Sequence, residues 1–187
     1  MILTATSVIE VHPPDQSVIP VRLLTVETAD HRDELRDMIG ETRSEVGIDP
    51  YQTGPADYWL IEVGGDIAGY TGVHSIDVKS RRCRGIIWVR PEYRRKGVAT
   101  EAVRLRNDLL FDQWNMNRIE WAVSQSNAGS RLFSKSRAYA LLEGVLKEAV
   151  YYDGAYHDVE LYAVTRRMRD LMLDKRNDFT NPGQGEP

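Results

Sequence analysis

The chain alternates short apolar runs with amphipathic stretches, which is the pattern of a mixed α/β domain. Two apolar runs joined by Gly64-Gly65-Asp66 predict a β-hairpin, because glycine readily adopts the backbone angles of a tight turn. Strands are predicted at residues 21–26, 58–63, 67–74, 85–89, 118–123, 142–152 and 158–165, with a polar turn at 80–84 and a loop at 48–57. This order of elements is that of a mixed α/β domain.

Three segments are predicted to be helices. The clearest one, at residues 97–113, has apolar residues three or four positions apart, at Val98, Ala102, Leu105 and Leu109. A first helix is expected to begin near Thr28-Ala-Asp30, whose polar oxygens can cap its first turn, and to run to about Gly47. A short helix fits residues 130–137.

The length of 187 residues fits one domain with a core of its own. Residues 1–19 have little periodicity, and we interpret them as a loose N-terminal arm with a short strand as an option at 7–11. The domain is placed at residues 20–166. Residues 167–187 are expected to form a charged, helix-like stub followed by a disordered tail.

Composition excludes several classes of protein. The formal net charge of −4 provides no overall field to attract nucleic acid, so no nucleic-acid partner is expected. Cys83 is the single cysteine, which rules out an intrachain disulfide and a zinc site of several cysteines, and we expect no metal site. No signal peptide and no membrane-spanning apolar run is evident, so we expect a cytoplasmic protein without a membrane partner.

The most informative segment runs from Tyr93 to Glu101, where three cations precede a glycine at the start of the predicted helix. The first turn of a helix has N–H groups without intrahelical partners, and the helix dipole is positive there. A strand, a basic turn with a glycine and a helix N-terminus together favour an anion site, and pyrophosphate is the ligand that this arrangement suggests. A solvated basic turn is the simpler alternative.

The residues Arg94-x-x-Gly97-x-Ala99 resemble the acyl-CoA-binding signature of the GNAT N-acyltransferases. A second block follows with the spacing of the RimJ/RimL-like branch, which includes ribosomal-protein N-terminal acetyltransferases. It comprises Asn127-Ala-Gly-Ser130, Glu143-Gly144-Val145-Leu146-Lys147 and Asp153-Gly154-x-Tyr156-x-Asp158. The resemblance extends from about Gly65 to Thr165. It implies the GNAT fold, an α/β domain whose mostly antiparallel, twisted sheet has about seven strands, splayed in the middle, with about four flanking helices.

The resemblance also implies which residues hold acetyl-CoA. The backbone near the end of the predicted strand 85–89 would pair with the pantetheine arm, amides from Arg94 to Ala99 would hold the pyrophosphate, and Asn127 would bind a pantetheine amide. The full set expected at the cofactor is Trp88, Val89, Arg90, Arg94, Arg95, Lys96, Gly97, Val98, Ala99, Thr100, Asn127 and Ser130.

The proton-transfer residues depart from the family pattern. Arg84 stands where many relatives have a glutamate base, and Ser134 stands where many have a tyrosine acid. Ser130 or Ser134 would then protonate the leaving thiolate. The base is left open between His74, whose ordinary pKa suits neutral pH, and the carboxylates, with a water relay as a further option. The candidate carboxylates are Asp77, Glu120 and Glu143.

The function implied by the resemblance is an acetyl-CoA-dependent N-acetyltransferase. A primary amine, on a protein N-terminus or a small molecule, would attack the thioester directly in a ternary complex. An acyl-CoA-binding sensor or interaction module with weak or no catalysis is the alternative, because the usual strand glutamate and the tyrosine are missing. A homodimer is left open.

Overall fold

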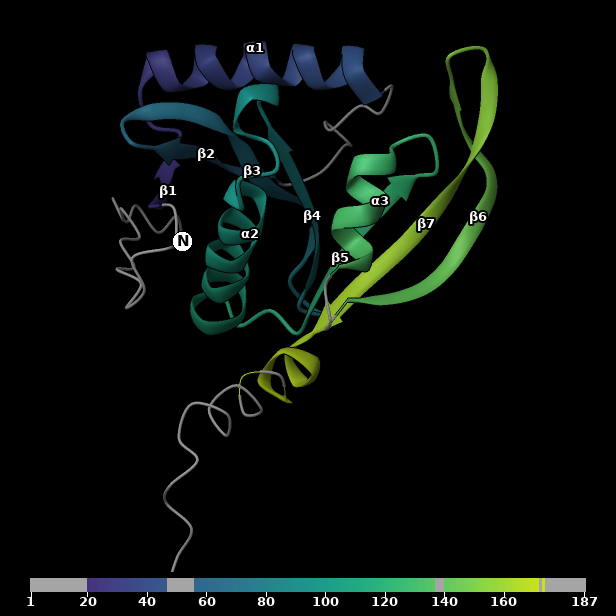
Figure 1. Cartoon of the computed structure of the whole chain (residues 1–187). Helices are drawn as coiled ribbons and strands as arrows, with labels where there is room; N and C mark the ends of the chain where they lie inside the picture. Colours follow the sequence, from purple (N-terminus) through teal and green to yellow (C-terminus); the bar gives the residue numbers. More distant parts are fainter. Residues whose placement is uncertain (1–19, 47–55, 137–139, 172, 174–187) are drawn as a thin grey trace, which may run out of the picture.

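The computed structural model describes residues 20–46, 56–136, 140–171 and 173 (Figure 1). The predicted N-terminal arm, most of the predicted loop at 48–57 and the C-terminal tail lie outside the described residues. Residues 166–171 are helical, as expected for the charged stub.

Seven strands form one sheet in the order β1-β2-β3-β4-β5-β7-β6. Only β4 and β5 run parallel to each other, and every other neighbouring pair is antiparallel. The strands are β1 (Val21–Thr25), β2 (Asp57–Val63), β3 (Asp66–Asp77), β4 (Arg82–Val89), β5 (Arg118–Ser124), β6 (Leu141–Tyr152) and β7 (Ala155–Thr165). The mixed α/β fold with a mostly antiparallel seven-stranded sheet is therefore confirmed.

Helices cover both faces of this sheet, each burying its own apolar stripe. The helix α1 (Ala29–Val46) packs Met38 against a cluster that includes Trp88 of β4. The helix α2 (Val98–Asp108) packs instead against Val89, the next residue of β4. Successive side chains of a strand point to opposite faces, so α1 and α2 lie on opposite sides of the sheet.

The third helix, α3 (Ala128–Lys135), follows β5. It shares the face of α2, because Trp121 packs against the α2 cluster and donates a hydrogen bond from Nε1 to Ser134 Oγ of α3 at 2.9 Å. Figure 1 shows α2 and α3 in front of the sheet and α1 across its upper end.

Several predicted boundaries were wrong. Residues 82–84 belong to β4 and not to a polar turn, because Arg82 and Arg84 face outward while Cys83 between them is buried. The helix predicted at 97–113 changes after Asp108 into a short π-helix, Leu109–Gln113. The helix α3 begins two residues before Ser130, since Asn127 caps it, and β7 begins at Ala155 because the turn at Asp153 and Gly154 is tight.

The pairing between β4 and β5 stops after three residue pairs. These are Arg82 with Arg118, Cys83 with Ile119, and Arg84 with Glu120. Beyond Arg84, β4 continues to Val89 with a partner on its β3 side only, while β5 continues with β7 only. The predicted splay in the middle of the sheet is confirmed, and it opens a gap between the two strands.

None of the helices in the described part of the chain is long and apolar enough to cross a membrane. The cytoplasmic location stays a prediction.

The close approach of β3 and β4 near Trp88 gives the first testable prediction. A Cβ on Gly69 would lie 2.3 Å from the carbonyl oxygen of Trp88, so we expect Gly69→Ala to force the strands apart and to lower the free energy of unfolding by about 1–3 kcal/mol or more. Urea denaturation measures this. Gly144→Ala is the control, since a Cβ there meets nothing within 4 Å. Equal midpoints for the two variants would contradict the prediction.

Candidate active site

The turn between β4 and α2 is held rigidly on the β4 side. The Arg90 N–H donates to the carbonyl oxygen of Ala68 on β3 at 2.9 Å. A 3₁₀ turn, η1 (Pro91–Tyr93), follows, in which the Arg94 N–H donates to the Pro91 carbonyl oxygen at 3.2 Å. The chain therefore leaves the sheet in one defined direction.

The backbone beyond Arg94 presents a run of open amides. Arg95 has a φ of 60° and Gly97 a φ of 83°, so both adopt the left-handed conformation. Within the described part of the chain, the N–H groups of Arg95, Lys96, Gly97, Val98 and Ala99 find no hydrogen-bond acceptor. Successive open amides at the start of a helix form an anion site. The predicted run is one residue too long, because the Arg94 amide is already bonded.

The cations of this turn have different roles. The Arg94 side chain folds back onto β4, where Nε donates to the Val89 carbonyl oxygen at 2.8 Å and the guanidinium lies 5.9 Å from the centre of the Trp88 ring. It therefore fixes the strand end. Arg95 and Lys96 are exposed beside the open amides. Lys96 Nζ lies 5.8 Å from the centre of the Tyr93 ring, which keeps it near the turn.

The free edge of β4 offers further donors to the gap. Successive backbone N–H groups along a strand point to opposite sides of it. The Arg90 N–H points to β3, so the Trp88 N–H, two residues earlier, points to β3 as well. The N–H groups of Ile87 and Val89 therefore point toward the gap. Among Trp88, Val89 and Arg90, only Val89 has its amide on that side. Ile87 was missed by the sequence analysis, although the strand period of two could have found it once the register was known.

A buried arginine lies behind this edge. Arg106 of α2 is 3% exposed, and its Nη1 donates to the Ile86 carbonyl oxygen at 3.0 Å. The Thr71 hydroxyl donates to the same oxygen at 2.8 Å. The Ile86 carbonyl and the Ile87 N–H belong to one peptide group, and donors at the oxygen polarise that group. They make the Ile87 N–H a stronger donor toward the gap, which suits the stabilisation of a developing oxyanion.

The packing of Arg106 also depends on Gly85. A Cβ there would lie 2.8 Å from an Nη atom of Arg106, so a side chain at this position would force the guanidinium to shift. The sequence analysis did not find Arg106, because nothing in a helical charge pattern shows that one arginine points to the sheet.

The opposite wall of the gap is formed by β5 and α3. Asn127 Oδ1 accepts a hydrogen bond from the Ser130 N–H at 2.9 Å and so caps α3. Its Nδ2 finds no acceptor among the described residues, which leaves that group available to a ligand. Ser130 is half-buried at the start of α3, whereas Ser134 is buried and accepts the Trp121 Nε1 hydrogen bond.

His74 lies on the other face of the sheet, directly opposite Arg84 in the β3–β4 ladder. It is 9% exposed, and its Nδ1 lies 3.1 Å from the Ser75 hydroxyl oxygen. Burial, and secondly the charge of Arg84, hold the pKa of His74 below its ordinary value of 6.5. Nε2 has no hydrogen-bond partner among the described residues. Every buried polar side-chain atom of those residues has a partner, so Nε2 is not buried and reaches solvent. This neutral imidazole is equipped to accept a proton.

The candidate carboxylates are all engaged in ion pairs. Glu143 is bound by both terminal nitrogens of Arg118, which keeps the pKa of Glu143 below its usual range. Asp77 accepts hydrogen bonds from Ser80 and from Arg82, and its pKa is lowered as well. A lowered pKa makes any of these groups a weaker proton acceptor, but the pKa of His74 is lowered from 6.5, whereas those of Glu143 and Asp77 are lowered from 4.5 and 3.8, so His74 is the preferred candidate of the three.

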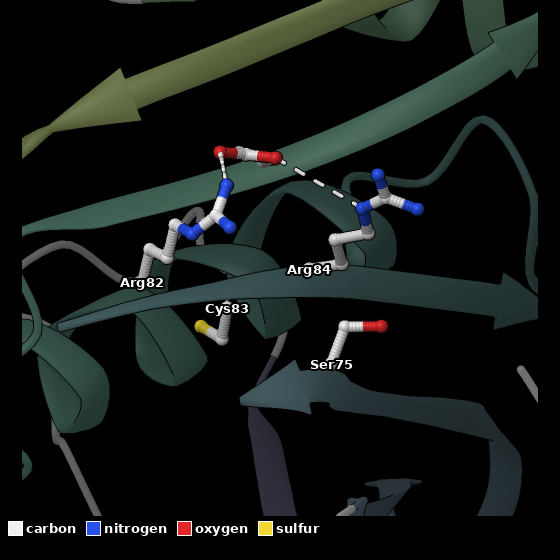
Figure 2. Close-up of a pocket in the computed structure, with 5 residues that line it drawn as sticks. Ser75, Arg82, Cys83 and Arg84 are labelled. Atoms are coloured by element: carbon white, nitrogen blue, oxygen red, sulfur yellow. Dashed lines mark ion pairs between the residues drawn. The ribbon is translucent and has the colours of Figure 1, made fainter. Parts of the chain in front are cut away.

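A pocket of about 200 Å³ lies at the paired end of β4 and β5, on the face of His74. It is lined by Ser75, Arg82, Cys83, Arg84 and Glu120. In Figure 2 the side chains of Arg82 and Arg84 point to one side of β4 and that of Cys83 to the other. The site thus has an anion cradle at one end of the gap and this pocket at its closed end.

The comparisons with known proteins agree with this geometry. The model of the "Acetyltransferase (GNAT) family" matches residues 26–139, which is more than half of the chain. The chain belongs to the GNAT acetyltransferase family. As a member, it is an acetyl-CoA-dependent N-acetyltransferase, and its fold is the one that the sequence resemblance implied.

Two kinds of acceptor occur in the names of relatives of this acetyltransferase. "Putative ribosomal N-acetyltransferase YdaF" of Bacillus subtilis is 27% identical over 131 residues, covering 68% of this chain and 71% of that protein. The spermidine N(1)-acetyltransferase of Escherichia coli K12 is 27% identical over 100 residues, covering 54% of this chain and 53% of that protein.

Solved structures with the same fold include members of both groups. One is a spermidine N-acetyltransferase of Vibrio cholerae in complex with CoA and spermine, at a TM-score of 0.68 and 18% identity, covering 79% of this chain and 96% of that one. Another is the ribosomal L7/L12 α-N-protein acetyltransferase RimL, at a TM-score of 0.66 and 17% identity, covering 78% and 90%.

The environment of His74 gives a prediction about this acetyltransferase that needs no ligand. We expect an imidazole pKa below 6.5 for His74 in an NMR titration, with the signal assigned by its loss in His74→Gln. Arg84→Gln should raise this pKa and still leave it below 6.5, because burial is the larger cause. Arg36→Gln, on the exposed side of α1, should leave it unchanged. A pKa at or above 6.5 in the unmodified protein would refute the prediction.

Proposed function

We propose that this acetyltransferase binds acetyl-CoA along the gap between β4 and β5 and transfers the acetyl group to a primary amine that enters on the face of His74. The observation that carries the proposal is the run of five open amides from Arg95 to Ala99, next to the unpaired edge of β4. An extended ligand with an anionic end and a strand-like arm would use both features.

Each part of the cofactor has a suitable counterpart in the protein. The open amides, with Gly97 at their centre, suit the pyrophosphate, and Arg95 and Lys96 add charge-assisted hydrogen bonds. The Val89 and Ile87 amides suit the amide carbonyls and the thioester of a strand-like pantetheine arm. The Nδ2 group of Asn127 would bind the arm from the opposite wall.

The reaction is the direct attack of a neutral amine on the thioester carbon. As the C–N bond forms and the C–S bond breaks, the amine loses a proton and the departing thiolate gains one. His74, kept neutral by its burial, would accept the proton from the amine. The Ile87 N–H would stabilise the oxyanion. Ser130, at the start of α3, is the better-placed proton donor to the thiolate, since Ser134 is buried beneath Trp121.

The acceptor is an amine of the kind that the named relatives use, on a protein N-terminus or on a small molecule. An α-amino group has a pKa near 8, against about 10.4 for a lysine side chain. It therefore presents more of the reactive neutral form at neutral pH.

A homodimer is a further proposal, based on the outer edge of the sheet. The strand β6 pairs with β7 on one side, and the described residues provide it with no partner on the other. It exposes large apolar side chains, with relative exposures of 51% at Leu141, 45% at Leu142, 39% at Val145 and 49% at Leu146. Exposed apolar residues on an unpaired edge strand favour association, and a second copy of this strand is the partner we propose.

The cradle gives a prediction about cofactor binding. At a φ of 83° a residue with a Cβ is strained, and a branched side chain would project where the phosphates would lie, so we expect Gly97→Val to weaken CoA binding at least tenfold. Isothermal titration calorimetry with CoA measures this, and circular dichroism checks the fold.

Gly154→Val is the matched control for Gly97→Val. Gly154 has a φ of 76° in the turn between β6 and β7, and a Cβ there meets nothing within 4 Å, so the strain is similar but far from the cradle. Its affinity for CoA should equal that of the unmodified protein. If Gly97→Val binds CoA as tightly as Gly154→Val does, the cradle does not hold the cofactor.

The edge strand gives a prediction about assembly. We expect the double variant Leu142→Lys/Leu146→Lys to be monomeric in light scattering coupled to size-exclusion chromatography, because charges on the apolar edge oppose pairing. Val78→Lys, at an isolated apolar residue that is 78% exposed, should leave the mass of a dimer unchanged. A monomeric mass for the unmodified protein at micromolar concentration would reject the dimer.

A further inference from the structure

We propose that Ser75 is the positioning residue for His74, and that its hydroxyl oxygen accepts a hydrogen bond from the Nδ1–H of that imidazole. Nε2 is then unprotonated and can take the proton of the acceptor amine. The proposal rests on the proposed function, in which His74 is the base, and it adds the residue that prepares this base for the reaction.

Ser75 lies in an irregular part of β3. His74 pairs with Arg84, but the next pair in the ladder is Asp77 with Arg82, so three steps along β3 match two steps along β4. The extra residue makes a β-bulge, a feature that often re-aims a side chain next to an active site. Ser75 itself has a φ of 51°, a left-handed conformation that is strained for most residues other than glycine.

The bulge brings the Ser75 hydroxyl to the imidazole of His74. In a regular strand two successive side chains point to opposite faces, so Ser75 would point away from His74. Instead, Ser75 Oγ lies 3.1 Å from His74 Nδ1. Ser75 also lines the pocket, and Figure 2 shows it next to the part of β4 that carries Cys83 and Arg84. The strained backbone of the bulge therefore places a hydroxyl against one nitrogen of the ring.

The two nitrogens of the His74 ring have different surroundings, which determines where each proton goes. Nδ1 has Ser75 Oγ as its partner, whereas Nε2 reaches solvent. An amine that arrives from solvent therefore gives its proton to Nε2. A neutral imidazole carries one proton, so that proton has to be on Nδ1 if Nε2 is to accept another. A serine oxygen can accept the hydrogen bond that this Nδ1–H donates.

A hydroxyl suits this role because it carries no charge. Burial, and secondly the charge of Arg84, lower the pKa of His74 and so hold the imidazole in its neutral form. A carboxylate beside Nδ1 would instead favour the imidazolium and raise that pKa. The Ser75 hydroxyl fixes the position of the proton without opposing the neutral state, and it stays bonded to Nδ1–H after Nε2 is protonated.

The first measurement is the tautomer of His74, which is observed without acetyl transfer. The ring nitrogens of isotope-labelled histidine are followed by NMR at a pH where the imidazole is neutral, and the His74 signals are assigned by their loss in His74→Gln. We expect the proton on Nδ1 and an unprotonated Nε2 in the unmodified protein. Ser75→Ala and Ser75→Gly should shift the tautomer ratio toward Nε2–H by roughly three- to tenfold, the effect of one net hydrogen bond.

The second measurement is kcat, and the same two variants separate the hydroxyl from the backbone of the bulge. Both remove the hydroxyl, but Ser75→Ala keeps the left-handed strain while Ser75→Gly relieves it. With saturating acetyl-CoA, and with an unblocked peptide and spermidine as acceptors, kcat should fall roughly three- to tenfold in both variants. The affinity for CoA, measured by calorimetry, should stay unchanged, which also shows that the variants are folded.

Ser136→Ala is the matched control. The Ser136 hydroxyl also makes one hydrogen bond, donated to the Phe133 carbonyl oxygen at 2.8 Å, and it lies at the C-terminal end of α3. Its removal should change neither the tautomer of His74 nor kcat.

The outcomes separate this proposal from the proposed function. If the protein acetylates amines but His74 carries its proton on Nε2, Ser75 is not the positioning residue and the acetyl transfer stands. Full activity of Ser75→Gly or of Ser75→Ala has the same meaning, whichever tautomer is found. If the unmodified protein neither binds CoA nor acetylates any amine, the proposed function fails, and this proposal fails with it.

Discussion

The organisation of this acetyltransferase depends on the place where β4 and β5 stop pairing. Three ladder pairs hold the two strands together at one end, and the arginines around Glu120 reinforce that end by ion pairs. Beyond Arg84 each strand keeps only its outer neighbour. An unpaired backbone N–H is costly when it is buried away from polar partners. A ligand in the gap that accepts hydrogen bonds from the free edge of β4 would therefore be favoured energetically.

The helices anchor β4 on both faces of the sheet. The helix α1 packs against Trp88 and the helix α2 against Val89, so β4 is anchored on both faces although it has a partner along only one edge. Arg106 adds a fixed charge behind the same strand, at the Ile86 carbonyl. A buried charge needs hydrogen-bond partners. The hydrogen bond of Arg106 also acts on the peptide group between Ile86 and Ile87, whose N–H points toward the gap. Stability and the geometry of the site thus come from the same contacts.

The two faces of the sheet carry different elements. The helices α2 and α3 lie on one face, while His74, Arg84 and Glu120 lie on the other. Arg84, which stands where the family resemblance leads one to expect a glutamate, places a cation on the face of His74.

The sequence by itself determined which strands and helices follow one another along the chain, the start of a helix at Gly97, and the family. These features depend on local periodicity and on short sequence motifs. It identified the basic turn but not which amides remain open, since the Arg94 amide is bonded to Pro91 and the Arg95 amide is not. It could not place Ile87 at the gap, Arg106 behind it or Arg84 opposite His74. Those relations depend on strand register and on which face a side chain takes, and only the packing of elements distant in sequence decides them.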